Sequence, residues 1–272
     1  MSRGIGEYIA RLVRAEVRAA AGYHVPDSRG MVKLDAMENP FPWPEVVRDA
    51  LGERIRDVEF NRYPDPQAST LKARMRAALG IDPRWELLLG NGSDEIIQML
   101  VTALAGPGCR VLAPAPSFVM FRLIAQWSGV GFDEVPLGDD FTLDVAAMLA
   151  AMERHQPRLI FLACPNNPTG NWLPDEALRR LLDLPVLVVL DEAYVDFASQ
   201  PSRAPWVLGR ENLVVLRTFS KAAGIAGLRL GYSICPAWLM DELWKFKQPY
   251  NVNVAATVAG LAALAHRADL AP

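Results

Sequence analysis

Short apolar runs alternate with helix-like segments along most of the 272-residue chain, and this alternation limits the possible folds more than any other feature. The clearest run is 186–190 (VLVVL), in which every residue is apolar. Such a run is typical of a parallel strand that is covered by helices on both faces. A helix predicted over 174–182 precedes it, and a second buried strand is predicted over 159–163. The repeated pattern predicts one large α/β domain, a mostly parallel sheet with helices on both faces.

Other elements are expected from the spacing of apolar residues and from the residues that start and stop helices. The spacing over 5–21 predicts one amphipathic helix that packs on the core or on a partner subunit. Pro44 is expected to open a helix that runs to about residue 56. Ser69 and Gly80 are expected to cap and to end a helix over 71–79. The remaining expected strands are 87–89, 110–113, 130–135, 214–216 and a short strand-like stretch at 32–34, and the remaining helices are 96–104, 119–128, 144–154 and one from about 254.

The composition argues against several classes of protein. Hydrophobic residues make up 51% of the chain, which is enough for a large core. The net charge of −3 argues against binding to nucleic acids or to a membrane surface. The three cysteines and three histidines lie far apart, so neither a disulfide framework nor a metal centre is expected. The sequence has no long uncharged apolar run and no signal-peptide pattern, so we expect a cytoplasmic enzyme.

One lysine stands near the end of a predicted strand and is flanked by small residues. Lys221 follows the hydroxyls of Thr218 and Ser220, and Arg229 comes shortly afterwards. Partial burial lowers the pKa of a lysine and makes its amine available as a nucleophile toward a carbonyl. Two hydroxyls and a fixed cation suit a phosphate. These residues together suggest a phosphorylated aldehyde cofactor, although a Ser-Lys pair alone also fits a surface lysine after a strand.

Further polar residues follow other predicted strands, at the ends where open α/β sheets bind ligands. The turn 90–95 (GNGSDE) leads into a helix, whose free N–H groups and dipole favour an anion. Asp191 ends an apolar run, and a buried carboxylate needs a cationic partner such as a protonated pyridine nitrogen. Asn167 and Tyr194 could bind a ring oxygen, and Phe118 could stack on a ring. Taken singly, these residues also fit strand ends, turns and core packing.

Taken together, the segments resemble those of fold-type I aminotransferases that depend on pyridoxal 5'-phosphate, and they are similar to histidinol-phosphate aminotransferases. The matching segments stand in the order of the family across about residues 30–255, which argues against chance agreement. They are 32–34 (VKL) with 37–40 (MENP), 61–66 (NRYPDP), 89–95 (LGNGSDE), 165–170 (PNNPTG), 191–194 (DEAY), 220–232 and 249–253 (PYNVN).

The resemblance implies a role for each matching residue. Lys221 is expected to form the Schiff base with the cofactor and then to move a proton as base and acid. Asp191 is expected to hold the pyridinium charge, which makes the ring an electron sink. The other implied cofactor contacts are Asn167 and Tyr194 at the ring oxygen, Phe118 on the ring in place of the usual tyrosine, Gly92, Ser93, Asp94, Thr218, Ser220 and Arg229 around the phosphate, and Tyr63 at the cofactor of a neighbouring subunit. Asn39 and Asn251 are expected near the substrate, and no metal is implied.

The resemblance also implies how the chain is organised. Residues 1–45 are expected to form an N-terminal arm with dimer and small-domain contacts, and residues 46–272 the large domain that binds pyridoxal 5'-phosphate. Family members continue well beyond this length, so a small C-terminal domain, with arginines that bind the substrate, is expected to be largely missing. We find no arginine in this chain that could be assigned to that role.

The implied reaction is transamination of histidinol phosphate with 2-oxoglutarate, which gives imidazole-acetol phosphate and glutamate by ping-pong chemistry. The expected protein is a cytoplasmic homodimer of histidine biosynthesis, whose partners are a small amino donor and a keto acid, without nucleic acid or membrane. Two alternatives remain open. One is an aromatic-amino-acid aminotransferase or a phospho-amino-acid decarboxylase on the same scaffold. The other is a truncated relative that binds the cofactor without turnover.

Overall fold

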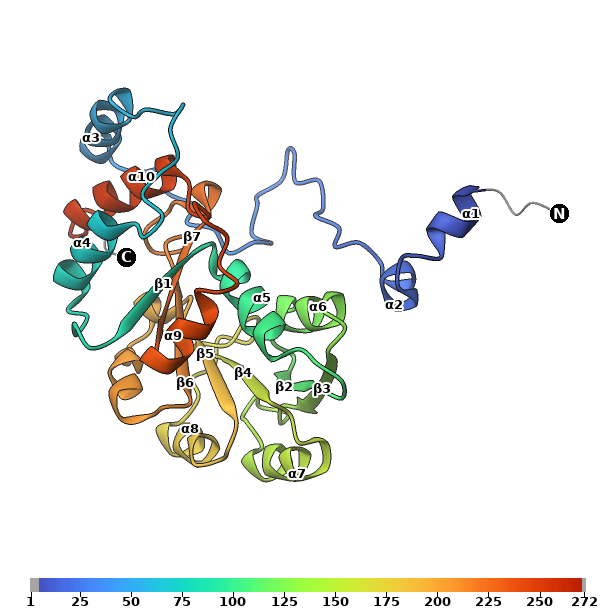
Figure 1. Cartoon of the computed structure of the whole chain (residues 1–272). Coiled ribbons are helices and arrows are strands. Elements are labelled where there is room, and N and C mark those ends of the chain that lie inside the picture. The colour runs from blue at the N-terminus through green and yellow to red at the C-terminus, as the bar shows by residue number, and fades with distance from the viewer. Residues whose placement is uncertain (1–4, 271–272) are drawn as a thin grey trace.

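The computed structural model describes residues 5–270, and these contain a seven-stranded sheet with the strand order β1-β7-β6-β5-β4-β2-β3 (Figure 1). The strands are β1 (Glu86–Asn91), β2 (Arg110–Ala115), β3 (Gly131–Pro136), β4 (Leu159–Ala163), β5 (Leu187–Asp191), β6 (Leu213–Thr218) and β7 (Leu230–Cys235). The strands predicted beyond residue 80 are therefore present, with small shifts at their ends. β7 is a strand that the sequence analysis did not identify.

One strand of the sheet runs against the others. β7 is antiparallel to both of its neighbours, β1 and β6, and every other pair is parallel. β1 therefore points in the same direction as β2 to β6, because the two reversals cancel. The carboxyl ends of these strands and the amino end of β7 meet at one edge of the sheet. The mostly parallel sheet expected from the sequence is confirmed, and its geometry brings distant polar segments to one edge.

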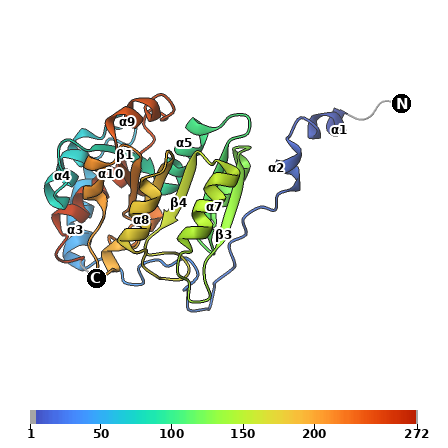
Figure 2. The ribbon, with the colours of Figure 1, turned by 90° about the horizontal axis from the view of Figure 1, so that it is seen from below.

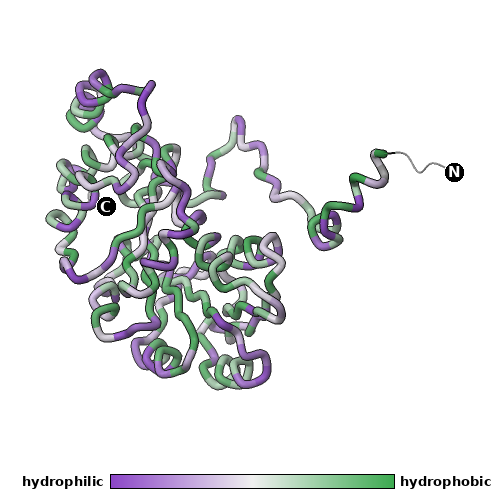
Figure 3. Tube along the Cα trace, viewed as in Figure 1, coloured by the Kyte–Doolittle hydropathy of each residue, from purple (hydrophilic) through white to green (hydrophobic). Residues whose placement is uncertain are grey.

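Helices cover both faces of the sheet, as the sequence predicts (Figure 2). One apolar cluster includes residues of α5 (Ser93–Leu104), α6 (Met120–Trp127) and α9 (Ala237–Leu243), and the other includes residues of α4 (Ser69–Leu79), α7 (Val145–His155), α8 (Asp175–Leu182) and α10 (Val254–Ala265). Alternate residues of β5 enter opposite clusters, Val188 one and Val189 the other. Burying each such side chain stabilises the fold by about 1.5–3 kcal/mol relative to leaving it exposed. Figure 3 shows that the central strands are strongly apolar.

The starts of the predicted helices depend on local capping. α3 (Glu45–Arg56) begins directly after Pro44, as predicted. The prediction that Ser69 caps α4 is wrong. Ser69 is the first residue of the helix, and the N-cap position is taken by Ala68, which provides no side-chain cap. The Ser69 backbone N–H donates instead to the Asp65 carboxylate of the preceding loop, at 2.7 Å. Gly80 ends α4 in the left-handed conformation, with a φ of 63°, as predicted.

Three short 3₁₀ helices lie in loops of the described part of the chain, η1 (Val195–Phe197) and η2 (Ala204–Gly209) after β5 and η3 (Ala226–Leu228) after β6. Within residues 5–270, no helix has both the length and the apolar character that crossing a membrane requires.

The N-terminal arm differs from its prediction. Instead of one helix over 5–21, it contains two short ones, α1 (Ile5–Ala10) and α2 (Ala15–Ala19). Figure 1 shows α1 extending away from the domain, whereas α2 lies beside α6, where Arg14 donates a hydrogen bond to the Trp127 carbonyl. The strand expected over 32–34 is also wrong, because these residues are irregular. A short helix gains little stability from its own hydrogen bonds. The apolar side chains Ile5 and Leu12 remain exposed, so packing does not extend the helix either.

Candidate active site

A pocket at the carboxyl edge of the sheet collects most of the residues predicted as a site. It is lined by Ser93, Asp94, Phe118, Ala163, Asn167, Asp191, Ala193, Tyr194, Thr218, Ser220, Lys221 and Arg229. Every predicted cofactor contact is in this lining except Gly92 and Tyr63. The sequence analysis missed Ala163 and Ala193, although small residues at or just beyond a predicted strand end are a signal that could have found them.

The directions of the strands explain this gathering. Asn167 follows β4, Asp191 is the last residue of β5, and Thr218 is the last residue of β6. Ser93 begins α5 shortly after the end of β1. Arg229 directly precedes β7 and reaches the same edge because β7 is antiparallel. A cation near the start of one strand therefore joins polar groups at the ends of the others.

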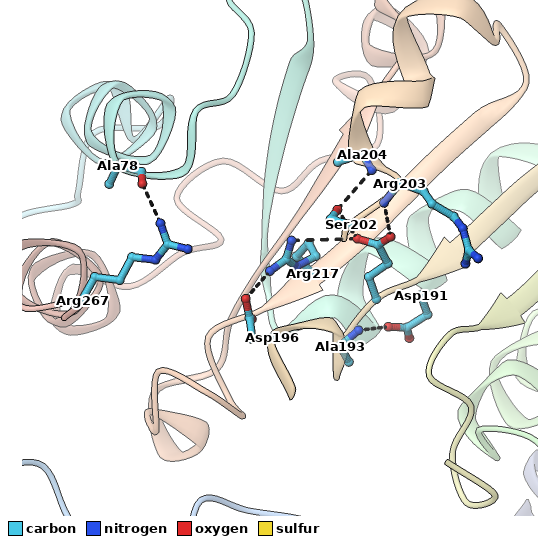
Figure 4. A network of polar contacts seen from close by, with 10 residues as sticks. Ala78, Asp191, Ala193, Asp196, Ser202, Arg203, Ala204, Arg217 and Arg267 are labelled. Atoms are coloured by element: carbon cyan, nitrogen blue, oxygen red, sulfur yellow. Dashed lines mark hydrogen bonds and ion pairs between the residues drawn. The ribbon is translucent and has the colours of Figure 1, made fainter. Parts of the chain in front are cut away.

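Asp191 is a buried acid that has no close cationic partner among residues 5–270. The residue is only 5% exposed, and among the described residues its side chain accepts one hydrogen bond, from the Ala193 N–H at 2.9 Å (Figure 4). Burial raises the pKa of Asp191 to about 7, and the negative charges of Asp94 and Glu192 add to this effect. The carboxylate form is therefore unfavourable until a cation enters the pocket. A protonated ring nitrogen would be such a cation.

The start of α5 has the opposite character and attracts an anion. Ser93 and Asp94 are the first two residues of this helix, whose first N–H groups lack partners within the helix. Arg229 Nη2 lies 2.9 Å from Asp94 Oδ2, which holds the guanidinium beside the helix end. The Thr218 hydroxyl accepts the Ser220 N–H at 3.0 Å. A helix N-terminus, two hydroxyls and an arginine form a donor set that suits a phosphate.

Two glycines allow this close approach of backbone and side chains. Gly92 does not line the pocket, but its φ is 79° and a Cβ atom there would lie 2.5 Å from Arg229 Nη2. A Cβ atom on Gly231 would lie 2.3 Å from the backbone nitrogen of Ser93. The arginine and the first turn of α5 can therefore lie this close only because both positions lack a side chain.

The position and the pKa of Lys221 suit a nucleophile. Its Nζ donates a hydrogen bond to the Ala36 carbonyl at 2.8 Å and lies 5.3 Å from the centroid of the Tyr194 ring. Burial is the main cause that lowers the pKa of Lys221; the Glu38 carboxylate opposes this shift and the Arg229 guanidinium adds to it. A lowered pKa leaves a larger share of the amine uncharged near neutral pH. The structure therefore favours the form of Lys221 that attacks a carbonyl.

Tyr194 and Asn167 form a polar pair on the pocket wall. Asn167 Nδ2 lies 3.4 Å from the Tyr194 hydroxyl. Burial raises the pKa of Tyr194 to about 12, and the nearby Asp191 charge contributes, so the hydroxyl stays protonated and can donate. Phe118 also lines the pocket and packs edge-on against Phe121, with ring centroids 5.4 Å apart.

Besides Gly92, three predicted site residues lie outside this pocket. Tyr63 is 81% exposed and stacks on Tyr250, with ring centroids 4.5 Å apart. Asn39 lines a neighbouring cavity that shares Lys221 with the pocket. Asn251 uses its amide within the chain and donates to the Leu89 carbonyl at 3.0 Å. The expected contacts of Asn39 and Asn251 with substrate, and of Tyr63 with a neighbouring subunit, stay predictions.

Comparisons with known proteins agree with this site and fold. The family model for aminotransferase class I and II matches residues 29–271. Histidinol-phosphate aminotransferase 2 of Cupriavidus pinatubonensis is 50% identical over 269 residues, which are 96% of this chain and 73% of the relative. The crystal structure of histidinol-phosphate aminotransferase from Sinorhizobium meliloti in complex with pyridoxal-5'-phosphate has a TM-score of 0.79 and 30% identity. It covers 86% of this chain, and this chain spans 64% of it.

A solved structure with a different activity is also similar. The L-threonine-O-3-phosphate decarboxylase from Porphyromonas gingivalis has a TM-score of 0.71 and 28% identity, and the match covers 84% of this chain and 67% of that one. The resemblance inferred from the ordered motifs is thus confirmed at the level of the family. With a family model matched over 29–271 and a relative identical at half of the aligned positions, the chain belongs to the class I and II aminotransferases.

Proposed function

We propose that the pocket binds pyridoxal 5'-phosphate and that the protein transfers an amino group from histidinol phosphate to 2-oxoglutarate. One observation carries this proposal: the buried Asp191 carboxylate lines the same pocket as the Lys221 amine and the Arg229 cradle. A site that only binds phosphate has no use for a desolvated acid. An acid, an amine and an anion site together match a ring nitrogen, an aldehyde and a phosphate on one molecule.

The residues present fit this cofactor group by group. The first turn of α5 and Arg229 would hold the phosphate, Asn167 and Tyr194 the ring oxygen, and Phe118 the face of the ring. Asp191 would hold the proton on the ring nitrogen. When bound, the cofactor supplies an electron sink for the bond that breaks at the substrate α-carbon.

Lys221 would serve twice in this proposal. Its Nζ is the group that binds the aldehyde covalently, and the lowered pKa keeps a share of it uncharged for that purpose. When free, the same amine would hold and move a proton at the substrate α-carbon. The Ala36 carbonyl, 2.8 Å from Nζ, orients the amine. The Tyr194 hydroxyl, with a pKa of about 12, would remain a donor throughout.

The substrate pair is proposed from the relatives. The half-identical relative and the Sinorhizobium meliloti structure are both histidinol-phosphate aminotransferases. The similarity to L-threonine-O-3-phosphate decarboxylase supports a second candidate, decarboxylation of a phosphorylated amino acid in the same pocket. Product analysis separates the two, since decarboxylation releases carbon dioxide and needs no keto acid.

We also propose a cytoplasmic homodimer in which residues 1–45 form an arm and 46–272 the cofactor domain. Tyr63 supports the dimer, because it lies exposed and outside the pocket of its own chain. A residue that serves the site of a neighbouring subunit must lie at such a surface position.

The experiment begins with cofactor uptake. Purified protein is incubated with pyridoxal 5'-phosphate, desalted and examined by absorbance near the edge of the visible range. We expect a Schiff-base band in the wild type, none in Lys221→Ala, and an unchanged band in Lys245→Ala, whose lysine lies on the surface beside Glu242. A wild-type protein that takes up no cofactor refutes the proposal.

Turnover is then tested on the loaded protein. Glutamate or histidinol phosphate should each convert the bound cofactor to pyridoxamine phosphate in a single turnover. Release of carbon dioxide from a phosphorylated amino acid without a keto acid would favour the decarboxylase instead. A loaded protein that converts with none of these substrates would be a non-catalytic relative.

A further inference from the structure

A second buried acid lies directly behind the pocket. Glu192 follows Asp191 at the end of β5, and its relative exposure is 0%. Successive residues of an extended chain face opposite sides, so Glu192 points away from the pocket that Asp191 lines. The strand register agrees: Asp191 is paired with Leu216 on β6, and Arg217, the next residue, has its Nη1 3.9 Å from Glu192 Oε2.

Glu192 has partners within the chain that Asp191 lacks. It accepts hydrogen bonds from the Ser202 hydroxyl and from the Arg203 backbone N–H, the latter at 2.7 Å (Figure 4). Its own backbone N–H donates to the Leu216 carbonyl at 2.9 Å. The carboxylate therefore ties the loop at 202–203 to the end of β5, beside the residue that faces the pocket.

The Arg203 side chain carries this connection to the neighbouring strand. Arg203 is 2% exposed, and its guanidinium donates to Cys164 Sγ at 3.1 Å and to Asp175 Oδ1 at 2.8 Å. The same group lies over the Trp172 ring, 4.2 Å from its centroid. Cys164 directly follows β4. Backbone and side chain of Arg203 thus join the ends of β5 and β4.

These two strand ends supply the proposed ring contacts. Cys164 stands three residues before Asn167, and Glu192 stands between Asp191 and Tyr194. The strand ends also bond directly, from the Cys164 N–H to the Asp191 carbonyl at 2.8 Å. A shift of either end would change both the 3.4 Å separation between Asn167 Nδ2 and the Tyr194 hydroxyl and the direction of the Asp191 carboxylate.

We propose that Glu192 and Arg203 are positioning residues, which lock the ends of β4 and β5 so that Asp191, Asn167 and Tyr194 present their polar atoms to one bound ring. The inference rests on the proposed function for the identity of the ring. Neither Glu192 nor Arg203 lines the pocket, so their effect on a ligand acts through other residues. The contacts of Glu192 and Arg203 lie within the protein, so they can be tested without the cofactor.

A purely structural role predicts a different result, and the chain offers a matched control. Arg110 and Asp133 form an ion pair at 2.6 Å between β2 and β3, at the far edge of the sheet. The Asp133 side chain is 13% exposed and the Arg110 side chain 38%, so Asp133→Asn breaks an ion pair whose carboxylate is largely buried. It should lower stability without affecting the strand ends at the pocket.

The first experiment measures amide hydrogen exchange in the cofactor-free protein. In Glu192→Ala and Arg203→Lys, we expect exchange in 164–170 and 191–196 to become at least about tenfold faster, the factor for losing one charge-assisted hydrogen bond. Exchange in β2 and β3 should not change, whereas Asp133→Asn should give the reverse pattern. Glu192→Gln keeps an acceptor for the Arg203 N–H and should recover part of the protection. Equal acceleration throughout the sheet would overturn the inference.

The second experiment uses pyridoxal 5'-phosphate itself. Circular dichroism in the absorption band of the bound cofactor reports the orientation of the ring. We expect a changed signal per bound cofactor in Glu192→Ala and Arg203→Lys but not in Asp133→Asn. Cofactor affinity should fall by about tenfold or more in the same two variants. Normal uptake by the wild type, with signal and affinity unchanged in both variants, refutes the positioning inference alone. Absence of uptake by the wild type refutes the proposed function instead.

Discussion

Replacing Asp191 by asparagine is expected to make the cofactor-free protein more stable at neutral and alkaline pH. Burial raises the pKa of Asp191 from 3.8 to about 7, with contributions from Asp94 and Glu192. The unfolded chain ionises near the ordinary value, so between about pH 4 and pH 7 it has lost a proton that the folded chain keeps. Stability therefore falls as the pH rises through this window, and the full cost is present above about pH 7.

The size of the effect follows from the pKa difference. At 1.36 kcal/mol per pH unit, a rise from 3.8 to about 7 corresponds to about 4 kcal/mol. That is a large share of the roughly 5–15 kcal/mol that keep a typical protein folded. Asparagine carries no charge to desolvate, and its side-chain oxygen can still accept the Ala193 N–H. The gain in Asp191→Asn should be near zero below about pH 4 and approach about 4 kcal/mol above pH 7.

Urea unfolding of the cofactor-free wild type and variant, at several pH values from 4 to 8, measures this difference. Asp133→Asn is a control of opposite sign, because the hydrogen bond from Arg110 lowers the pKa of Asp133 and makes its ionised form stabilising. Loading with pyridoxal 5'-phosphate should reverse the order and leave the wild type more stable than Asp191→Asn. A stability difference that is independent of pH, or that shrinks as the pH rises, would refute this account of Asp191.

Three further predictions concern the pocket walls. Gly231→Ala would place a Cβ atom 2.3 Å from the Ser93 nitrogen and should lower the free energy of unfolding, measured in urea, by about 1–3 kcal/mol. At Gly227 an added Cβ atom would have no described neighbour within 4 Å, so Gly227→Ala should have little effect. Tyr194→Phe should weaken cofactor binding by about tenfold in a fluorescence titration, and the loss should be equal at pH 6 and pH 9 because the pKa of Tyr194 is about 12. The rate of cofactor attachment to Lys221 should level off at a lower pH than for an exposed lysine in a peptide, because burial lowers the pKa of Lys221; a plateau at the same pH would contradict this.

Much of the fold follows from the sequence because strongly apolar runs have few alternatives. The run at 186–190 must be covered on both faces, and β5 is buried along its whole length. β7 escaped the prediction because Leu230–Cys235 contains glycine and polar residues and follows a loop already interpreted as part of the site. The prediction of one N-terminal helix failed for another reason. The spacing predicts an apolar face, but apolar side chains such as Ile5 and Leu12 stay exposed, and the helix breaks at residues 11–14.

The candidate site was predictable where residue type and position both carry information. An acid after a buried strand, a lysine among small residues and a glycine turn before a helix can each be recognised, and the structure brings Asp191, Lys221 and Ser93 to one pocket. Arg203 could not be found in this way. It is an arginine in a loop far from the motifs, and its burial between Trp172 and Cys164 is known only once the chain is folded.

Asp191 and Glu192 are neighbouring carboxylates at one strand end that have different roles. Both are buried, and burial raises the pKa of each. Glu192 obtains a hydroxyl and a backbone N–H from the chain and lies near Arg217, so its charge can be met within the protein. From the described part of the chain, the Asp191 carboxylate receives one backbone hydrogen bond, and it lines the pocket, where a ligand could supply a cation. Because the Asp191 charge is not neutralised within the described protein, a cationic ligand gains binding free energy by neutralising it. A variant that satisfied Asp191 from within the protein would be more stable and would bind such a ligand less tightly.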